Sequence, residues 1–415
     1  MNPEEMKLCK AKIYQKSCPL PDVEERVREV CGPLLPSVKA GARIALAVGS
    51  RGIANIDHIV KTVADCLISV GAKPFIVPAM GSHGGAVAEG QAELLEGYGI
   101  SERIMGIPVL SSMDVEYLGD ADCDAPLPVH MDSHAFGADG VIVVNRVKAH
   151  TDFHGVHESG IVKMLVIGLG KHRQAILMHR FGADGLRDLV PVAAKKVLES
   201  GKIIGGIGII EDGFDDTADV VFAYPDEFFE VDAELLARSK TLMAKLPFEH
   251  IDALVIDCMG KNISGTGMDP NVIGRMRIMG QLDDFPVCRT IAVLDLTDVS
   301  HGNATGVGLA DIVTQKLSDK IDWKVTYENI VTSGFLQRGF LPVVAGDSLA
   351  VVGMALSAGN YTDESIRFAR IRDTLHLDEA YLSKALMDEL KACGKGEQLS
   401  EFKPLSFFGG ELEGF

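Results

Sequence analysis

Residues 44–85 read IALAVGSRGIANIDHIVKTVADCLISVGAKPFIVPAMGSHGG, and this stretch decides the fold. The apolar run Ile44–Val48 predicts a buried strand that breaks at the turn 49–52. Apolar residues then recur at helical spacing, at positions 56, 59, 60, 63, 67 and 70. Gly71 ends this helix, Pro74–Pro78 predicts a second strand, and a second helix is expected at about residues 86–98. A strand, a glycine-bearing turn and a helix, twice in succession, predict a parallel sheet.

The alternation continues outward from this stretch and restarts after a junction at residues 247–250. Further strands are expected at 140–145, 203–210, 253–257, 290–296 and 349–354, and further helices at 171–181, 186–200, 226–245, 309–317, 363–374 and 378–392. We therefore expect an α/β protein of two domains, with mainly parallel sheets around an interdomain cleft. Residues 1–246 would form a cofactor-binding domain, and residues 247–415 would contribute to the substrate cleft.

Composition and charge narrow the class of protein. The 415 residues are 47% hydrophobic and 24% charged, as in ordinary globular chains. The formal charge, 40 − 58 = −18, argues against nucleic acid or an anionic membrane as a partner of the whole surface. No apolar run reaches the length of a membrane span, and the acidic N-terminus is not a signal peptide. Eight scattered cysteines without a C-x-x-C pair predict reduced thiols and a cytoplasmic location.

Histidines cluster in residues 145–179, which hold five of the 12 in the chain: His150, His154, His157, His172 and His179. Such clusters are typical of metal ligation or proton transfer, because neutral imidazole is both a ligand and a base near neutral pH. Lys163 lies in the middle, just before an apolar run. A buried ammonium is costly, so covalent use of the amine would explain a lysine there.

Two further candidates follow strands of the predicted parallel sheet, at the edge where functional groups gather. Arg51 follows the first strand and can bind a carboxylate or phosphate through two hydrogen bonds. His83 lies in the turn Gly81–Gly85 at the start of the second helix, where the helix dipole favours a neutral imidazole and bound anions.

Together these pieces resemble the lactate racemase family, the racemases and epimerases that depend on a nickel-pincer nucleotide. The resemblance is strongest in residues 44–180 and fainter in 250–310. Its carriers are Arg51, His83, the turn ending at His150, Ser159-Gly160 before Lys163, and His179 sixteen residues after that lysine.

The resemblance implies a role for each of these positions. It implies that Lys163, preceded by Ser159 and Gly160, carries a dithio pyridinium mononucleotide, and that His179 is the protein's nickel ligand. His83 and His150 would act as acid and base, while Arg51 and Arg277 would bind the substrate. The implied reaction is racemisation or epimerisation of an α-hydroxy acid by reversible hydride transfer. The implied partners are that substrate and the enzymes that build and load the cofactor.

Some positions depart from the family pattern. Val48 replaces an acidic residue, Gly274 replaces a glutamine, Arg277 replaces a lysine, and the segment between His150 and Lys163 is longer. These departures predict a substrate larger or more polar than lactate. Two other hypotheses are a metal-dependent hydrolase that uses the histidines at 150, 154 and 157, and a relative that binds the cofactor without turnover.

Overall fold

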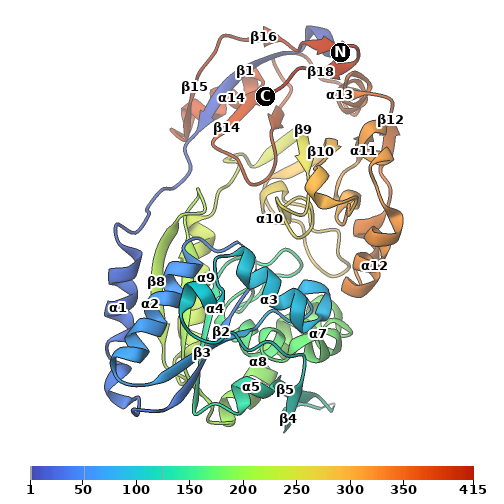
Figure 1. Ribbon diagram of the computed structural model, residues 1–415. Helices are drawn as coiled ribbons and strands as arrows, with labels where there is room; N and C mark the ends of the chain where they lie inside the picture. The colour runs from blue at the N-terminus through green and yellow to red at the C-terminus, as the bar shows by residue number, and fades with distance from the viewer. Residues whose placement is uncertain (1, 51, 125) are drawn as a thin grey trace. The chain divides into compact units, whose positions relative to one another are not determined.

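The computed structural model describes residues 2–50, 52–124 and 126–415, and the chain divides into two compact units (Figure 1). The N-terminal unit is Ser17–Met243, and the C-terminal unit combines Met1–Lys16 with Ala244–Phe415. Both units are α/β with mostly parallel strands, so the fold class predicted from the sequence is confirmed. None of the described helices is long and apolar enough to cross a lipid bilayer.

The N-terminal unit is built on a five-stranded sheet of order β3-β2-β6-β7-β8. The first four strands are parallel and β8 is antiparallel to β7. The strands of this unit are β2 (Arg43–Val48), β3 (Lys73–Pro78), β6 (Gly140–Arg146), β7 (Ile203–Glu211) and β8 (Thr217–Ala223), with a separate antiparallel hairpin of β4 (Val115–Asp120) and β5 (Pro128–Asp132).

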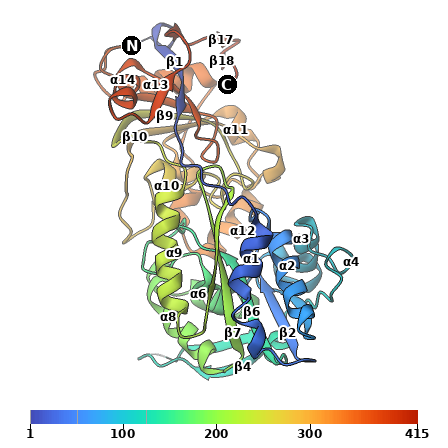
Figure 2. The same cartoon turned by 90° about the vertical axis from the view of Figure 1, so that its left-hand side faces the viewer.

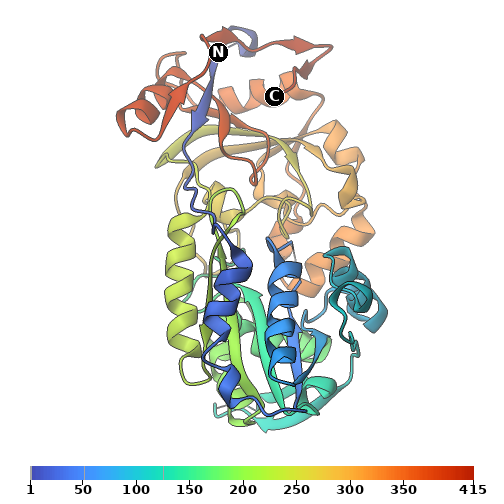
Figure 3. The same ribbon diagram turned by 60° about the vertical axis from the view of Figure 1, so that its left-hand side comes forward.

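Helices cover both faces of this sheet. They are α1 (Val23–Cys31), α2 (Ile56–Ser69), α3 (Ala88–Gly97), α4 (Glu102–Met105), α5 (Ser133–Phe136), α6 (Ile161–Lys163), α7 (Lys171–His179), α8 (Gly182–Glu199) and α9 (Phe228–Leu242), with 3-10 turns at Leu35–Ser37 and Gly84–Ala86 and a π-helix at Met164–Gly168. Helices α1 and α2 lie across one face and α9 lies on the other (Figures 2 and 3).

Two glycines of β7 let α9 approach the sheet closely. A Cβ on Gly206 would lie 2.6 Å from the Phe228 ring, and one on Gly208 would lie 2.4 Å from Leu235. Helix α6, which follows β6, contacts both β6 and α9. The close approach of α9 therefore brings its polar residues next to the segment that follows β6.

The C-terminal unit is built on a nine-stranded sheet, with the order β12-β11-β10-β9-β13-β14-β1-β15 and β16 paired to β1. The strands are β1 (Lys7–Ile13), β9 (His250–Met259), β10 (Val287–Leu296), β11 (Ile312–Thr314), β12 (Val343–Ala345), β13 (Phe368–Ile371), β14 (Glu379–Leu382), β15 (Gly396–Gln398) and β16 (Lys403–Pro404), with a hairpin of β17 (Phe407–Phe408) and β18 (Glu411–Leu412). The run from β12 to β13 is parallel, and the strands beyond it are antiparallel.

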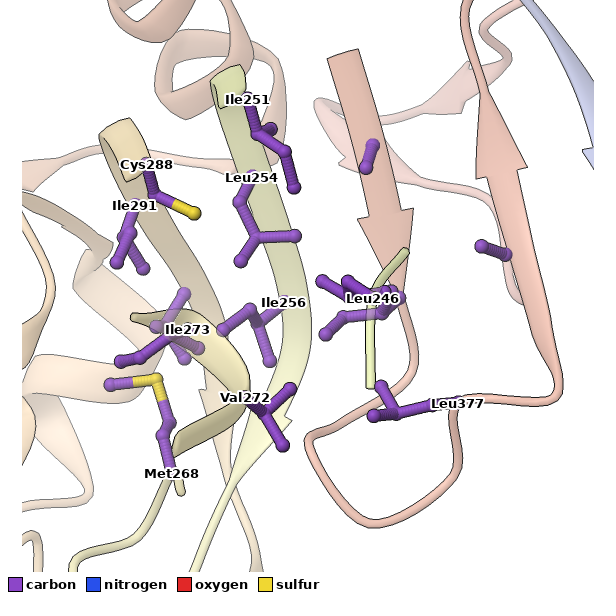
Figure 4. Packing of buried hydrophobic residues seen from close by; sticks show 14 of the residues in the cluster. Leu246, Ile251, Leu254, Ile256, Met268, Val272, Ile273, Cys288, Ile291 and Leu377 are labelled. Carbon is purple, nitrogen blue, oxygen red and sulfur yellow. The ribbon is translucent and has the colours of Figure 1, made fainter. Parts of the chain in front are cut away.

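The helices of this unit are α10 (Pro270–Ile273), α11 (Gln315–Asp319), α12 (Trp323–Ser333), α13 (Ser348–Ser357) and α14 (Lys384–Ala392), with 3-10 turns at Pro3–Glu5, Asp298–Ser300, Val307–Leu309 and Leu336–Gly339. In the core, Ile256 of β9 and Ile291 of β10 pack with Ile273 of α10 (Figure 4).

The first residues of the chain belong to the C-terminal unit. The sequence assigns residues 1–246 to one domain, but β1 pairs with β14 and β15. Side chains of β1 such as Cys9 and Ala11 are buried in the core of the C-terminal unit. A strand that pairs with residues more than 350 positions away leaves no local signal of its partner in the sequence.

Several elements predicted for the C-terminal unit are wrong. Residues 349–354, predicted as a strand, lie in helix α13, which begins where the Asp347 side chain accepts a hydrogen bond from the Ala350 N–H at 2.8 Å. The helices predicted at 309–317 and 363–374 contain the strands β11 and β13, and that predicted at 378–392 begins with β14. Short apolar runs fit a buried strand and a buried helix equally well, which explains these errors.

Candidate functional site

The segment after β6 forms a closed loop that returns His150 to Lys163. Lys148 and Ser159 exchange two backbone hydrogen bonds, of 2.8 and 3.2 Å, so residues 149–158 form a loop with its ends fixed. Helix α6 starts directly after this loop. His150 Nε2 and Lys163 Nζ are in direct hydrogen-bond contact.

The backbone near His150 defines which of its ring nitrogens carries hydrogen. The Asp152 N–H donates to His150 Nδ1 at 3.0 Å, so Nδ1 is an acceptor. In a neutral ring with Nδ1 accepting, the hydrogen is on Nε2, the nitrogen that contacts Lys163. The contact is then a hydrogen bond when the Lys163 amine is neutral and accepts, and the neutral amine is the nucleophilic form of lysine.

Glu158 holds the loop from inside. Its side chain is fully buried and accepts hydrogen bonds from the His150 N–H at 2.7 Å and the Gly155 N–H at 3.0 Å. Lys240 of α9 pairs with the same carboxylate at 2.5 Å, and His154 lies 3.5 Å away. Burial raises the pKa of Glu158, but these hydrogen bonds outweigh it, and the pKa is lowered overall. The carboxylate is therefore ionised and fixes the backbone of His150.

Asp232 of α9 supports the start of α6 in the same way, by accepting a hydrogen bond from the backbone. It is buried, its Oδ1 accepts from the Val162 N–H at 3.2 Å, and its Oδ2 lies 3.1 Å from His157 Nδ1. Gly160 is required beside it, because a Cβ there would lie 2.1 Å from Asp232 Oδ1. Asn145 donates to the Gly160 carbonyl at 3.1 Å. Glycine at this position thus lets a carboxylate support the turn that leads to Lys163.

Lys163 and His179 are joined by an irregular helical run. Helix α6 ends at Lys163, a π-helix covers Met164–Gly168, and α7 then carries the chain to His179. π-helical turns occur often at functional sites. His179 Nδ1 is buried without a hydrogen-bond partner in the described part of the chain. Burial lowers the pKa of His179, a positive charge on Lys163 would lower it further, and the carboxylate of Asp152 opposes both effects.

His179 therefore has the properties of a metal ligand. A lowered pKa leaves the imidazole neutral, and a buried polar atom without a partner is costly unless something binds it. A neutral imidazole suits nickel beside soft sulfur donors, so the residue fits the ligand role implied by the family resemblance.

His83 lies in a turn that is held by buried polar residues. Ser50 Oγ is in hydrogen-bond contact with His83 Nδ1. Gln91 donates to the carbonyl oxygens of Gly81 at 2.9 Å and His83 at 3.3 Å, and Lys171 donates to Gln91 Oε1 at 3.1 Å. The fully buried Lys171 is itself paired with the buried Asp132 at 3.2 Å. One lysine at the start of α7 thereby links the segment of Lys163 to the turn of His83.

The long helix predicted to begin just after His83 begins later in the structure. His83 precedes a single 3-10 turn, Gly84–Ala86, and α3 begins only at Ala88. A one-turn helix has little dipole of its own, so a helix-dipole effect on this imidazole loses its basis.

Of the two arginines predicted to bind the substrate, the structure describes Arg277. Arg51 lies outside the described residues. Arg277 lies in the C-terminal unit with φ +46°, and its guanidinium pairs with Asp311 Oδ1 at 2.7 Å. Gly274 is a structural glycine: it has φ +67°, and a Cβ there would lie 2.1 Å from the Pro286 carbonyl oxygen. Its reading as a change that enlarges the substrate pocket is therefore not supported.

The alternative three-histidine metal site is not supported either. His150 contacts Lys163, His154 faces Glu158 and His157 faces Asp232. Among residues 2–50, 52–124 and 126–415, no three His, Cys, Asp or Glu side chains are grouped to hold a metal ion. The loop histidines have carboxylate partners instead.

Sequence reasoning missed the residues that support the site: Gln91, Asp132, Glu158, Lys171 and Asp232. Their partners are distant in the chain, and a polar residue inside an amphipathic pattern gives no sign that it is buried. Glu158 could have been identified from the sequence, because it is a carboxylate inside the histidine cluster.

Comparison with known proteins supports the fold. No family model matches the chain, and no curated protein matches its sequence. Among solved structures, the lactate racemase apoprotein from Thermoanaerobacterium thermosaccharolyticum matches over 89% of this chain and 98% of its own, with a TM-score of 0.51 and 11% identity. This chain shares that fold. A structural-genomics protein from Thermotoga maritima covers 68% of this chain and 72% of its own, with 14% identity and a TM-score of 0.49.

Proposed function

We propose that this chain is a racemase or epimerase of an α-hydroxy acid that uses a nickel-pincer nucleotide tethered to Lys163. The observation that carries the proposal is the arrangement of Lys163, His150 and His179 in a chain with the fold of a lactate racemase. A fold alone does not fix a function, so the weight rests on these three side chains.

The chemistry explains why such residues are needed. The C–H bond of an α-hydroxy acid is a weak acid, so direct deprotonation is difficult, whereas removal of the hydrogen as hydride avoids a carbanion. The bound cofactor would supply the hydride acceptor. The protein must then exchange the hydroxyl proton on either side of the substrate, and His83 and His150 are our candidates for this acid–base role. Arg51 and Arg277 are the candidates for binding the substrate carboxylate.

The residues present fit the cofactor. Lys163 would be the point of attachment, with Ser159 and Gly160 beside it, and His179 would be the nickel ligand. An amide-like bond to the cofactor would remove the basicity of the Lys163 amine, so the nitrogen could no longer accept a hydrogen bond from imidazole. His150 Nε2 would then be released from its contact with the amine and become available to the substrate.

The departures from the family pattern at Gly274, His154 and His157 predict a substrate larger or more polar than lactate. Gly274 is required by the backbone, and both histidines lie beside carboxylates. We therefore propose the class alone.

The test is a panel of enantiopure α-hydroxy acids and sugar acids, incubated with protein that was produced together with the cofactor-building enzymes. We expect loss of optical activity, or formation of an epimer, for at least one compound. Protein without the cofactor and the Lys163→Ala variant should both be inactive. Turnover that is unchanged in the Lys163→Ala variant would contradict the proposal.

A further inference from the structure

A second candidate site lies beside another face of α7. A cavity of about 640 Å³ opens between this helix and the hairpin of β4 and β5, a size typical of sites for small organic molecules. The residues that line it are Tyr117, Pro128, His130, Arg173, Ile176, Leu177 and Arg180. At roughly 100° per residue, Arg173 and Arg180 lie about 80–120° around the helix from His172 and His179, and Ile176 lies between the two sets. The arginines of the cavity are thus on a different face of α7 from the candidate nickel ligand.

Two arginines give this cavity a positive charge. Arg173 and Arg180 are exposed, and neither has an ion pair or hydrogen bond to another described side chain. The chain as a whole carries a formal charge of −18. Most of the other arginines that the structure describes pair with carboxylates or stack on rings. The two residues are seven positions apart, roughly 10 Å along a helix axis, so two long side chains can reach one anion between them.

Among the described residues, the lining of the cavity holds these two arginines and no carboxylate. Outside the lining, Asp120 hydrogen-bonds the Tyr117 hydroxyl and Lys196 packs against Gly119. The same hairpin and its turn also carry the acidic residues Glu116, Asp122 and Asp124. An arginine pair of this kind favours a phosphate or carboxylate group.

The rest of the lining suits a flat organic body. Tyr117 and His130 are paired across the hairpin, with ring centroids 5.7 Å apart, and the Tyr117 side chain is largely exposed. Pro128, Ile176 and Leu177 supply apolar surface. His130 is buried, and its Nδ1 and backbone N–H both meet Gln174 Oε1, at 3.0 and 3.2 Å. Because that oxygen can only accept, Nδ1 carries hydrogen, and Nε2 is the ring nitrogen available to a ligand.

We propose that this cavity binds a phosphomonoester with an aromatic ring, such as a mononucleotide. Arg173 and Arg180 hold the phosphate, and Tyr117 with the apolar floor contacts the ring. The inference does not depend on the proposed racemase function, because the residues involved are separate from Lys163, His150 and His179.

The experiment is calorimetric titration of the purified full chain, without cofactor loading, with adenosine monophosphate. Adenosine and inorganic phosphate are titrated separately, and each should bind at least tenfold more weakly than the nucleotide. Arg173→Gln and Arg180→Gln should each weaken nucleotide binding by roughly tenfold to a hundredfold, the range for a lost charged hydrogen bond. Arg103→Gln is the matched control, because Arg103 is an exposed arginine of α4 outside the cavity.

Three results would overturn the proposal. They are no nucleotide binding at millimolar concentration, equal loss of binding in the Arg103→Gln control, and inorganic phosphate that binds as tightly as the nucleotide. The Tyr117→Ala variant separates the two halves of the site: it should lower nucleotide affinity and leave the weaker phosphate affinity unchanged. Circular dichroism of each variant checks that these surface substitutions leave the fold intact.

Discussion

Glu158→Ala should destabilise the N-terminal unit strongly. The substitution removes a buried carboxylate that accepts from the partly buried N–H groups of His150 and Gly155 and pairs with Lys240. Hydrogen bonds to a charged group contribute about 1.5–3 kcal/mol each, and removal of one partner of a buried pair costs about 3–5 kcal/mol. Lys240 keeps about a third of its side chain in water, so its own loss is small. We therefore expect a decrease of about 3–5 kcal/mol in the free energy of unfolding.

The assay is urea unfolding followed by far-ultraviolet circular dichroism. The chain has a single tryptophan, Trp323, and it lies in the C-terminal unit, so tryptophan fluorescence would not follow the affected unit. Glu158→Gln keeps the shape and should cost roughly half as much. Glu199→Gln, at an exposed ion pair with Lys196, is the control and should change stability by less than about 0.5 kcal/mol. A Glu158→Ala protein as stable as the control would refute the reasoning.

The stability should also depend on pH in a defined direction. The pKa of Glu158 is lower in the folded chain than its unfolded value of about 4.3. A depressed pKa stabilises the folded state fully above the unfolded value, and this contribution is lost as the pH falls through the folded pKa. The stability difference between wild type and Glu158→Gln should therefore shrink below about pH 4. A difference that grows on acidification would contradict the assignment.

Two further predictions concern the cofactor segment. Gly160→Ala should lower the unfolding midpoint, because the new methyl group would overlap the carboxylate of Asp232 and displace it. The control Gly97→Ala changes a helical glycine with open space around it, so its midpoint should be unchanged or slightly raised. Equal midpoints for the two variants would contradict this prediction. After cofactor loading, His179→Ala should keep the mass adduct and lose nickel, while Lys163→Ala should lose the adduct; nickel retained by His179→Ala would remove that residue from the ligand role.

The N-terminal half of the fold is predictable because its strands are buried on both faces. Ile44–Val48 and Pro74–Pro78 read as continuous apolar runs followed by glycine-bearing turns, and the structure places β2 and β3 there. The C-terminal half is harder because its elements are short. The apolar residues in a run such as 349–354 show no periodicity that distinguishes a strand from a helix. The feature that favours the helix is a single capping residue, Asp347.

The side chains proposed for chemistry could be chosen from the sequence, and their supports could not. Lys163 and His150 are close in sequence, so a loop can bring them together. The support that Lys240 gives to Glu158, and that Asp232 gives to Val162, comes from α9, 82 and 70 residues further along, and α9 is placed by glycines in β7. The φ of Gly274 shows the converse error, because a glycine required by the backbone looks in sequence like a change in a pocket.

The central claim is that Lys163 and His179 hold a nickel-pincer nucleotide. The most direct measurement is intact mass and metal content of protein produced with and without the enzymes that build this cofactor. We predict a covalent mass increase that maps to Lys163 by peptide analysis, and nickel close to one atom per chain, only in the co-produced sample. Wild-type protein that gains neither mass nor nickel, under conditions that load a lactate racemase, would contradict the account.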